Sequence, residues 1–166
     1  MGEGVVAEDT LVAKLEDGTT VLMKVILTNI GEAGFSPFGG VSFSMNITTQ
    51  IGFAPPEELR EKVKDMPVHY TGQELPRDGW EIVDIDWQRP AIIETAVSTS
   101  KGIFSVKVVA EVTMAARNMS YRTPSGDPVY QISWVYKPYW KPANTVERLK
   151  EARTAAKDVS PEDLTH

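Results

Sequence analysis

The side chains best suited to binding chemistry gather in the C-terminal half, where aromatic rings alternate with cations. Rings stack on bases and cations attract phosphates or carboxylates, so the mixture is typical of surfaces for single-stranded nucleic acid or for proteins. Segment 101–157 has ten Lys or Arg against four acids, a net charge of +6, which leaves −12 for the rest. The same difference in charge between the two parts is also expected if these side chains are only solvated and keep the protein soluble. The candidate ligand-binding residues here are Arg117, Tyr121, Arg122, Lys137, Tyr139, Trp140 and Lys141.

Two long connections are predicted to add to a binding site. Residues 31–40 form a Gly-rich loop with Phe35 and Phe38 at its tip. These rings would either press on a ligand as a flap or fold back and plug one end of the core. The second connection, 116–128, offers arginine side chains whose guanidinium groups match phosphate or carboxylate, although it need be no more than a turn.

Few residues have the types that catalysis or metal binding requires. Asp84 and Asp86 share one face of a predicted strand and could hold a cation with Glu94, but outward charges that protect an edge strand give the same pattern. His69 has no acid–base partner nearby in sequence. The chain has no Cys, which excludes thiolate nucleophiles and sulfur-ligated zinc, and it has no known catalytic motif. We assign no metal, no cofactor and no catalytic residue, and the balance favours a protein that is not an enzyme.

Alternating apolar and polar residues predict strands that would position these side chains. The clearest alternation runs through 20–30, 41–53, 104–114 and 129–137, and Asp17-Gly18 predicts a hairpin turn before the first of these. Strand 20–30 is apolar on both faces and is expected to be central. Amphipathic spacing predicts two helices, one over 57–66 after two prolines and one over 146–159.

The two halves repeat the same order of elements. A shift of 83 residues places Val21, Met23, Val25 and Leu27 on Phe104, Val106, Val108 and Ala110. We therefore expect an α+β fold: an antiparallel β-sheet of two pseudo-repeated βββα units with two amphipathic helices packed on the sheet. One compact domain, 1–166, would contain repeat 1 (about 10–66), linker 67–79, repeat 2 (about 80–159) and a short C-terminal tail, 160–166.

These observations favour a non-enzymatic binding protein whose aromatic and basic C-terminal surface takes single-stranded nucleic acid or an acidic protein partner. The alternative is a small-molecule enzyme or binder with a pocket between the sheet and loops 31–40 and 116–128. No apolar run approaches the roughly 20 residues that a membrane helix requires, so we expect no membrane span. The first ten residues lack a basic segment before an apolar stretch, so we expect no secretory signal and a cytoplasmic protein. Apolar residues on both strand faces favour a homo-oligomer, and frequent Pro is compatible with a thermophilic source.

Overall fold

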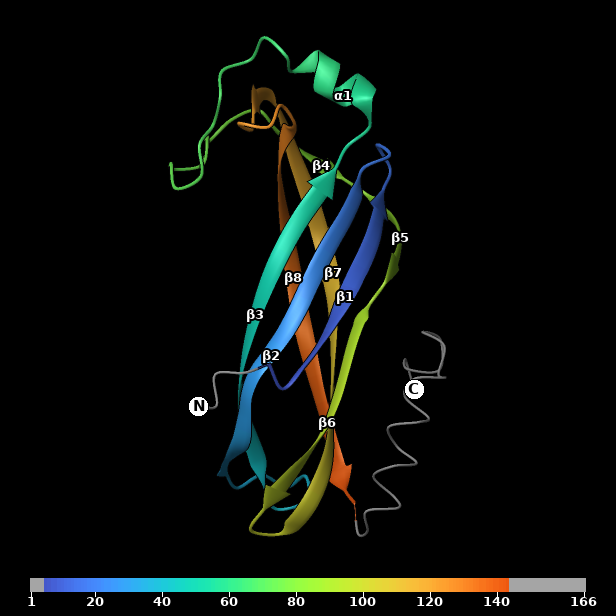
Figure 1. Cartoon of the computed structure of the whole chain (residues 1–166), viewed down its shortest axis with the longest axis vertical. Helices are drawn as coiled ribbons and strands as arrows, with labels where there is room; N and C mark the ends of the chain where they lie inside the picture. The colour runs from blue at the N-terminus through green and yellow to red at the C-terminus, as the bar shows by residue number, and fades with distance from the viewer. Residues whose placement is uncertain (1–4, 144–166) are drawn as a thin grey trace.

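The computed structural model describes residues 5–143, which form an elongated pair of antiparallel sheets (Figure 1). The elements are β1 (Ala7–Leu15), β2 (Thr20–Gly34), β3 (Ser42–Ala54), α1 (Glu57–Lys62), β4 (Trp80–Val83), β5 (Ile85–Arg89), β6 (Ala91–Thr99), β7 (Gly102–Arg122) and β8 (Pro128–Pro142). Sheet A has the order β3-β2-β1-β5. In sheet B the central β7 pairs with β8 on one side and with β4 and β6 on the other.

Each sheet contains a meander of three consecutive strands with the longest strand in the middle. In sheet A these are β1, β2 and β3, and in sheet B they are β6, β7 and β8. The strand order predicted for the two halves is therefore present, whereas descent from a duplicated unit stays a prediction. The run from β4 to β6 links the sheets, because β4 and β6 pair with β7 while the intervening β5 pairs with β1.

The core lies between the sheets and is built from the alternating residues. Val21, Met23, Val25 and Leu27 of β2 are fully buried, and they belong to one cluster with Phe104 and its alternate neighbours on β7. These are the two rows that the 83-residue shift superimposes. Burying such a side chain contributes about 1.5 to 3 kcal/mol, so the paired rows account for much of the stability of the fold.

The prediction of an α+β fold, with one sheet and two helices packed on it, was wrong, because the fold is almost all β and its strands form two sheets. The apolar inner face of each sheet is covered by the other sheet, so no helix is needed to bury it. In the described part of the chain the only helix is α1, a segment of six residues. The predicted helix 57–66 ends early, because the backbone of its C-cap residue, Val63, has left the helical conformation. The other predicted helix, 146–159, lies outside the described residues.

Helix α1 packs at one end of the sandwich, which we call the helix end (Figure 1). The Arg60 side chain donates to the Ser125 carbonyl at 2.6 Å and pairs with Asp127 at 2.8 Å, which holds α1 against the β7–β8 turn. The predicted linker 67–79 also packs here, since the His69 amide donates to the Arg122 carbonyl at 2.8 Å. No helix among residues 5–143 is long and apolar enough to cross a membrane.

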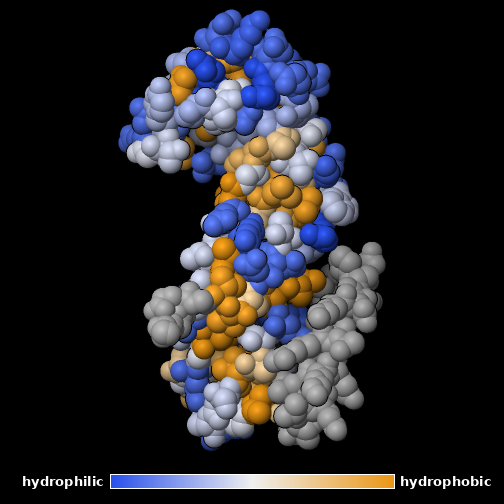
Figure 2. All heavy atoms as spheres, in the orientation of Figure 1, coloured by the Kyte–Doolittle hydropathy of each residue, from blue (hydrophilic) through white to orange (hydrophobic). Residues whose placement is uncertain are grey.

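Hydrophobic side chains are unevenly distributed over the surface. Figure 2 shows a mostly hydrophilic helix end and a broken hydrophobic band down the strands on the visible face. Strand β2 is central, as predicted, but its outer face is only partly covered, because Leu22 is 46% exposed. The surface candidates for binding therefore lie along the strands and at the end opposite α1.

Candidate functional site

The alternation of β8 separates its aromatic residues from its lysines. Trp134, Tyr136 and Trp140 lie opposite the core-facing residues Val112, Ala110 and Val106 of β7. Paired residues in antiparallel strands project to the same face, so these rings are on the inner side of sheet B. These β8 rings therefore lie on the side of sheet B that faces sheet A and form no common surface with the lysines.

Two ring contacts link β8 to β3 across the sandwich. Phe53 stacks on Tyr130 with ring centroids 5.1 Å apart, and Phe43 meets Trp140 edge to face at 5.2 Å. Aromatic pairs of this kind contribute about 0.5 to 1.5 kcal/mol beyond the area they bury. They join the two sheets on the side where neither β3 nor β8 has another strand beside it among the described residues.

The outer face of β8 carries the exposed cations. Lys137 pairs with Glu111 at 2.7 Å, and the hydrogen bond and charge of Glu111 raise the pKa of Lys137. Tyr139 is 49% exposed and lies opposite Lys107 of β7, while Lys141 is two residues further along the same face. Of the predicted aromatic and basic surface, this face therefore has one aromatic ring, Tyr139, and three lysines, Lys107, Lys137 and Lys141.

The predicted site residues divide between the two ends of the molecule. The Trp140 indole donates to the Phe38 carbonyl at 2.9 Å, which places loop 35–41 beside the end of β8. Arg122, in contrast, donates through Nε to the Met66 carbonyl at the helix end, 2.8 Å away. Most of the 21-residue strand β7 separates these points. Residues 31–34 belong to β2 and residues 116–122 to β7, so the predicted loops 31–40 and 116–128 are only partly loops, and they do not flank one cleft.

We define the aromatic end as Phe35, Phe38, Lys101, Tyr139, Trp140 and Lys141. Phe35 and Phe38 are 80% and 70% exposed, so of the two alternatives for these rings, the one in which they plug the core was wrong. Val41, which follows the loop, is fully buried and belongs to the core cluster. Lys101 belongs to this end because a Cβ at Gly40 would lie 3.6 Å from its Cε.

The backbone of this end is held by specific polar contacts. The Ser36 hydroxyl donates to the Val41 carbonyl and accepts from the Phe38 amide at 3.1 Å. Glu32 accepts from the Ser100 amide at 2.8 Å and from its hydroxyl at 2.6 Å, which joins β2 to the β6–β7 turn. These bonds from Ser100 lower the pKa of Glu32. The exposed rings thus project from an anchored loop.

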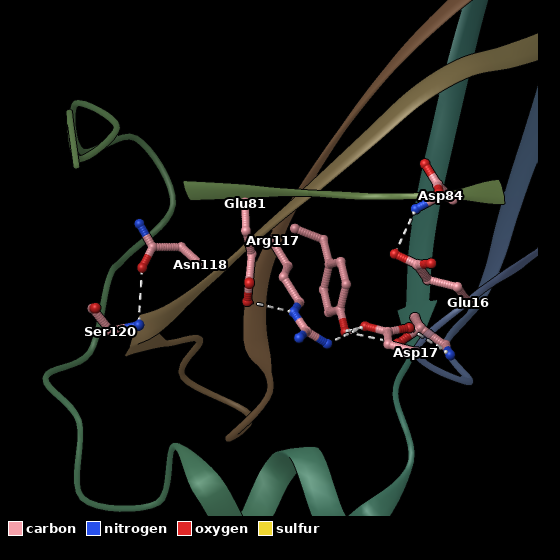
Figure 3. A network of polar contacts seen from close by, with 9 residues as sticks. Glu16, Asp17, Glu81, Asp84, Arg117, Asn118 and Ser120 are labelled. Carbon is pink, nitrogen blue, oxygen red and sulfur yellow. Dashed lines mark hydrogen bonds and ion pairs between the residues drawn. The ribbon is translucent and has the colours of Figure 1, made fainter. Parts of the chain in front are cut away.

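At the other end Arg117 belongs to a polar network that connects the sheets (Figure 3). Its guanidinium donates from Nε to Glu81 at 2.8 Å and from Nη1 to Asp17 at 2.9 Å. The Tyr130 hydroxyl also donates to Asp17, at 2.7 Å, and lies 2.7 Å from the Thr19 hydroxyl. Arg117 is therefore engaged by protein carboxylates and does not present a free cation to a ligand.

The network perturbs the titration of its members. Burial acts to raise the pKa of Asp17, but the hydrogen bonds that this carboxylate accepts outweigh burial and lower the pKa. Burial and the adjacent Asp17 charge raise the pKa of Tyr130. Burial acts to lower the pKa of Arg117, but Glu81 and Asp17 overcome it and raise the pKa. All three groups keep their usual charge states near neutral pH, so the cluster is a structural clamp.

Tyr121 and Arg122 also have structural partners. The Tyr121 ring contacts His69 edge to face with centroids 6.4 Å apart. Next to them Asn118 is fully buried, donates to the Asp78 carbonyl at 2.9 Å and accepts from the Ser120 amide at 2.9 Å. This region fixes the segment before β4 against β7.

Asp84, Asp86 and Glu94, the candidate cation ligands, do not form a metal-binding group in the described residues. Asp84 lies between β4 and β5, where its amide donates to the Glu16 carboxylate at 3.1 Å and its carbonyl accepts from the Glu16 amide at 2.9 Å. Within residues 5–143 no group of three or more His, Asp or Glu side chains could hold a metal ion.

Sequence reasoning missed two features of these sites. In the sequence Lys101 contributes only a positive charge, and its position in a turn does not indicate that it lies beside the Phe loop. Asp17 was interpreted only as a turn residue, although its side chain binds Arg117, 100 positions away in sequence. Comparisons with models of protein families, with characterised proteins and with solved structures found no match to this chain.

Proposed function

We propose that this chain is a non-enzymatic binding protein and that the aromatic end binds an acidic, partly apolar segment of another protein. The observation that carries the proposal is the pair of exposed rings, Phe35 and Phe38, on an anchored loop. Exposed phenylalanines gain about 2 to 3 kcal/mol each when a partner buries them. A loop already held in place loses little conformational entropy on binding.

The charges around the rings favour an acidic partner. Lys101 is exposed beside the loop. Lys141 and the half-exposed Tyr139 lie at the same end of the molecule, on the outer face of β8. Aromatic anchors surrounded by charges that remain partly solvated are typical of protein interfaces. Carboxylates on the partner would pair with the two lysines while apolar side chains cover the rings.

Single-stranded nucleic acid fits this surface less well. Stacking of successive bases requires a track of rings beside a continuous row of cations. Here Trp134 and Trp140 lie on the inner side of sheet B, while Lys137 lies on the outer side and pairs with Glu111. Arg117 and Arg122 are at the helix end and have protein partners.

Selection of a displayed peptide library on the parent protein tests the proposal, with counter-selection on the double variant Phe35→Ser, Phe38→Ser. The expected peptides combine Leu, Ile or Trp with Asp or Glu. Each Phe→Ser change should weaken the selected peptide roughly 30-fold, because loss of an interface anchor costs about 2 kcal/mol. Ile82→Ser, at a 66% exposed position on β4, is the matched control and should leave binding unchanged.

A labelled oligothymidine, titrated at two salt concentrations, tests the other ligand class. Salt-sensitive binding that Tyr139→Ala weakens would contradict the protein-partner proposal and favour nucleic acid. Peptides that bind the double Phe variant as tightly as the parent would also contradict it.

A further inference from the structure

Strand β3 has a free edge that lacks the usual protection against strand pairing. It is 13 residues long and contains no charged residue and no proline. Strand β2 occupies one side of it, and within the described residues no strand pairs with the other side. An uncharged, extended edge presents backbone donors and acceptors that another strand can bind.

The remaining edges of the two sheets are protected. Strand β8 contains Pro128, Pro138 and Pro142 as well as two lysines. Strands β4 and β5 are only four and five residues long and carry charges, and β6 carries Glu94. Prolines, charges and short length all discourage edge pairing, so β3 differs from the other edges of residues 5–143.

The backbone of β3 is also regular. The two irregularities in the β2–β3 pairing insert the extra residues, Thr28 and Ala33, into β2 and not into β3. A bulge bends the strand that contains it, and bulges on edge strands discourage pairing. Here the edge strand itself has no inserted residue in its pairing with β2, and burial alternates from 43 to 50, with even-numbered residues 44–52 exposed and Ile51 also 41% exposed.

The sequence of β3 is self-complementary about Thr48. Read outward from this residue in both directions, four of the five pairs match in type: Asn46 with Gln50, Met45 with Ile51, Ser44 with Gly52, and Phe43 with Phe53. The remaining pair, Ile47 with Thr49, shares only a β-branched side chain. In a two-fold symmetric contact, residue i of one copy meets residue j of the other and the reverse. Antiparallel pairing of two β3 strands centred on Thr48 would therefore place Phe beside Phe, Met beside Ile and amide beside amide.

We propose that β3 pairs antiparallel with β3 of a second copy of this chain, with the two-fold axis passing by Thr48. The two four-stranded A sheets then join into one continuous sheet. The inward rows of both strands meet on the inner side, and the polar rows meet on the outer side. The proposal concerns a different surface from the aromatic end and does not depend on the partner proposed there.

The absence of Cys from the chain allows a direct test of the register by cross-linking. In the proposed pairing the two Thr48 Cα atoms face each other about 4.5 to 5.5 Å apart, within disulfide range. Thr48→Cys should therefore form a covalent dimer on mild oxidation. Gln50→Cys is the matched control on the same face, because the two copies of position 50 would lie about 13 Å apart and should not cross-link.

Charge substitutions test the same register without oxidation. Asn46→Lys with Gln50→Lys places like charges opposite each other, and should reduce the mass in light scattering from twice 18.3 kDa to 18.3 kDa. Asn46→Lys with Gln50→Glu places opposite charges together and should keep the dimer. Ser133→Lys is the control at an exposed position of β8. It adds a lysine to a different edge strand, and the variant should remain a dimer.

The outcomes separate cleanly when circular dichroism confirms that each variant is folded. A parent protein that remains monomeric at several hundred micromolar overturns the proposal. Equal cross-linking of Thr48→Cys and Gln50→Cys, or equal masses for the Lys/Lys and Lys/Glu variants, overturns the register. Selective cross-linking at residue 48, together with dissociation of the Lys/Lys variant alone, supports it.

Discussion

Among single residues, Asp17 connects the most distant parts of the fold, because its carboxylate joins the β1–β2 turn to Arg117 of β7 and Tyr130 of β8. Its side chain is only 7% exposed. The clamp therefore fixes the two sheets relative to each other at this end, and its contribution should depend on the charge of one carboxylate.

Asp17→Asn should lower the free energy of unfolding at pH 7 by about 1.5 to 3 kcal/mol, the value of hydrogen bonds to a charged group. The folded-state pKa of Asp17 is lowered, so its stabilisation is present above the usual carboxyl pKa of about 3.9. The stabilisation is lost as pH falls through the lower, folded-state value. Urea unfolding of parent and variant at pH 7 and at pH 3 should show the difference shrinking in acid.

Glu61→Gln provides the control for this series. Glu61 pairs with Lys64 across 3.5 Å on the exposed surface of the helix end, where an ion pair contributes about 0 to 1 kcal/mol. A difference between parent and Asp17→Asn that is the same at both pH values would show that the Asp17 charge does not stabilise the fold.

The individual strands were largely predictable, whereas the layer that covers them was not. Alternation through 20–30 and 104–114 identified β2 and β7 and even the residues that face the core. Alternation shows that one face is buried but not whether a helix or a second sheet buries it. The short amphipathic segment at 57–66 favoured a helix on the sheet, and the structure places its six-residue helix at an end instead.

The candidate site was predictable in composition but not in arrangement. Trp140 and Lys141 are neighbours in sequence, yet the pleat sends them to opposite faces of β8. Phe38 and Trp140 are 102 positions apart and are joined by a hydrogen bond. Only the packing of β3 against β8 brings such residues together, and nothing in local spacing specifies it.

The anchoring of loop 35–41 by β8 leads to a prediction about Trp140→Phe. This variant keeps an aromatic ring beside Phe43 but removes the indole donor to the Phe38 carbonyl. Global stability should fall by only about 0.5 to 1.5 kcal/mol, the net value of one hydrogen bond. The amides of Gly39 and Gly40, whose bonds lie within the loop, should exchange with deuterium faster.

Amide exchange in the β1–β2 turn serves as the internal reference, since it lies near the helix end and should not respond. Unchanged exchange at residues 39 and 40 would show that the Trp140 bond does not hold the loop. Affinity for the selected peptides would then be expected to survive the substitution as well.

The molecule as a unit is long, because β7 runs from the aromatic end to the helix end through 21 residues. At about 3.3 Å per residue this strand is roughly 70 Å long. A compact protein of 166 residues has a radius of gyration of about 15 Å. Small-angle scattering of the Asn46→Lys, Gln50→Lys variant should give a clearly larger value, and one near 15 Å would contradict the extended shape.

Because β7 spans the molecule, the aromatic end and the helix end are too far apart to contact one small ligand at the same time. Pairing through β3 would turn one copy end for end, so the two Phe loops would point away from each other. Such a pair could bridge two partner molecules, but only at a spacing set by the strands, because a rigid connector cannot adapt its reach. The length of the strands would then fix the distance between the two bound partners.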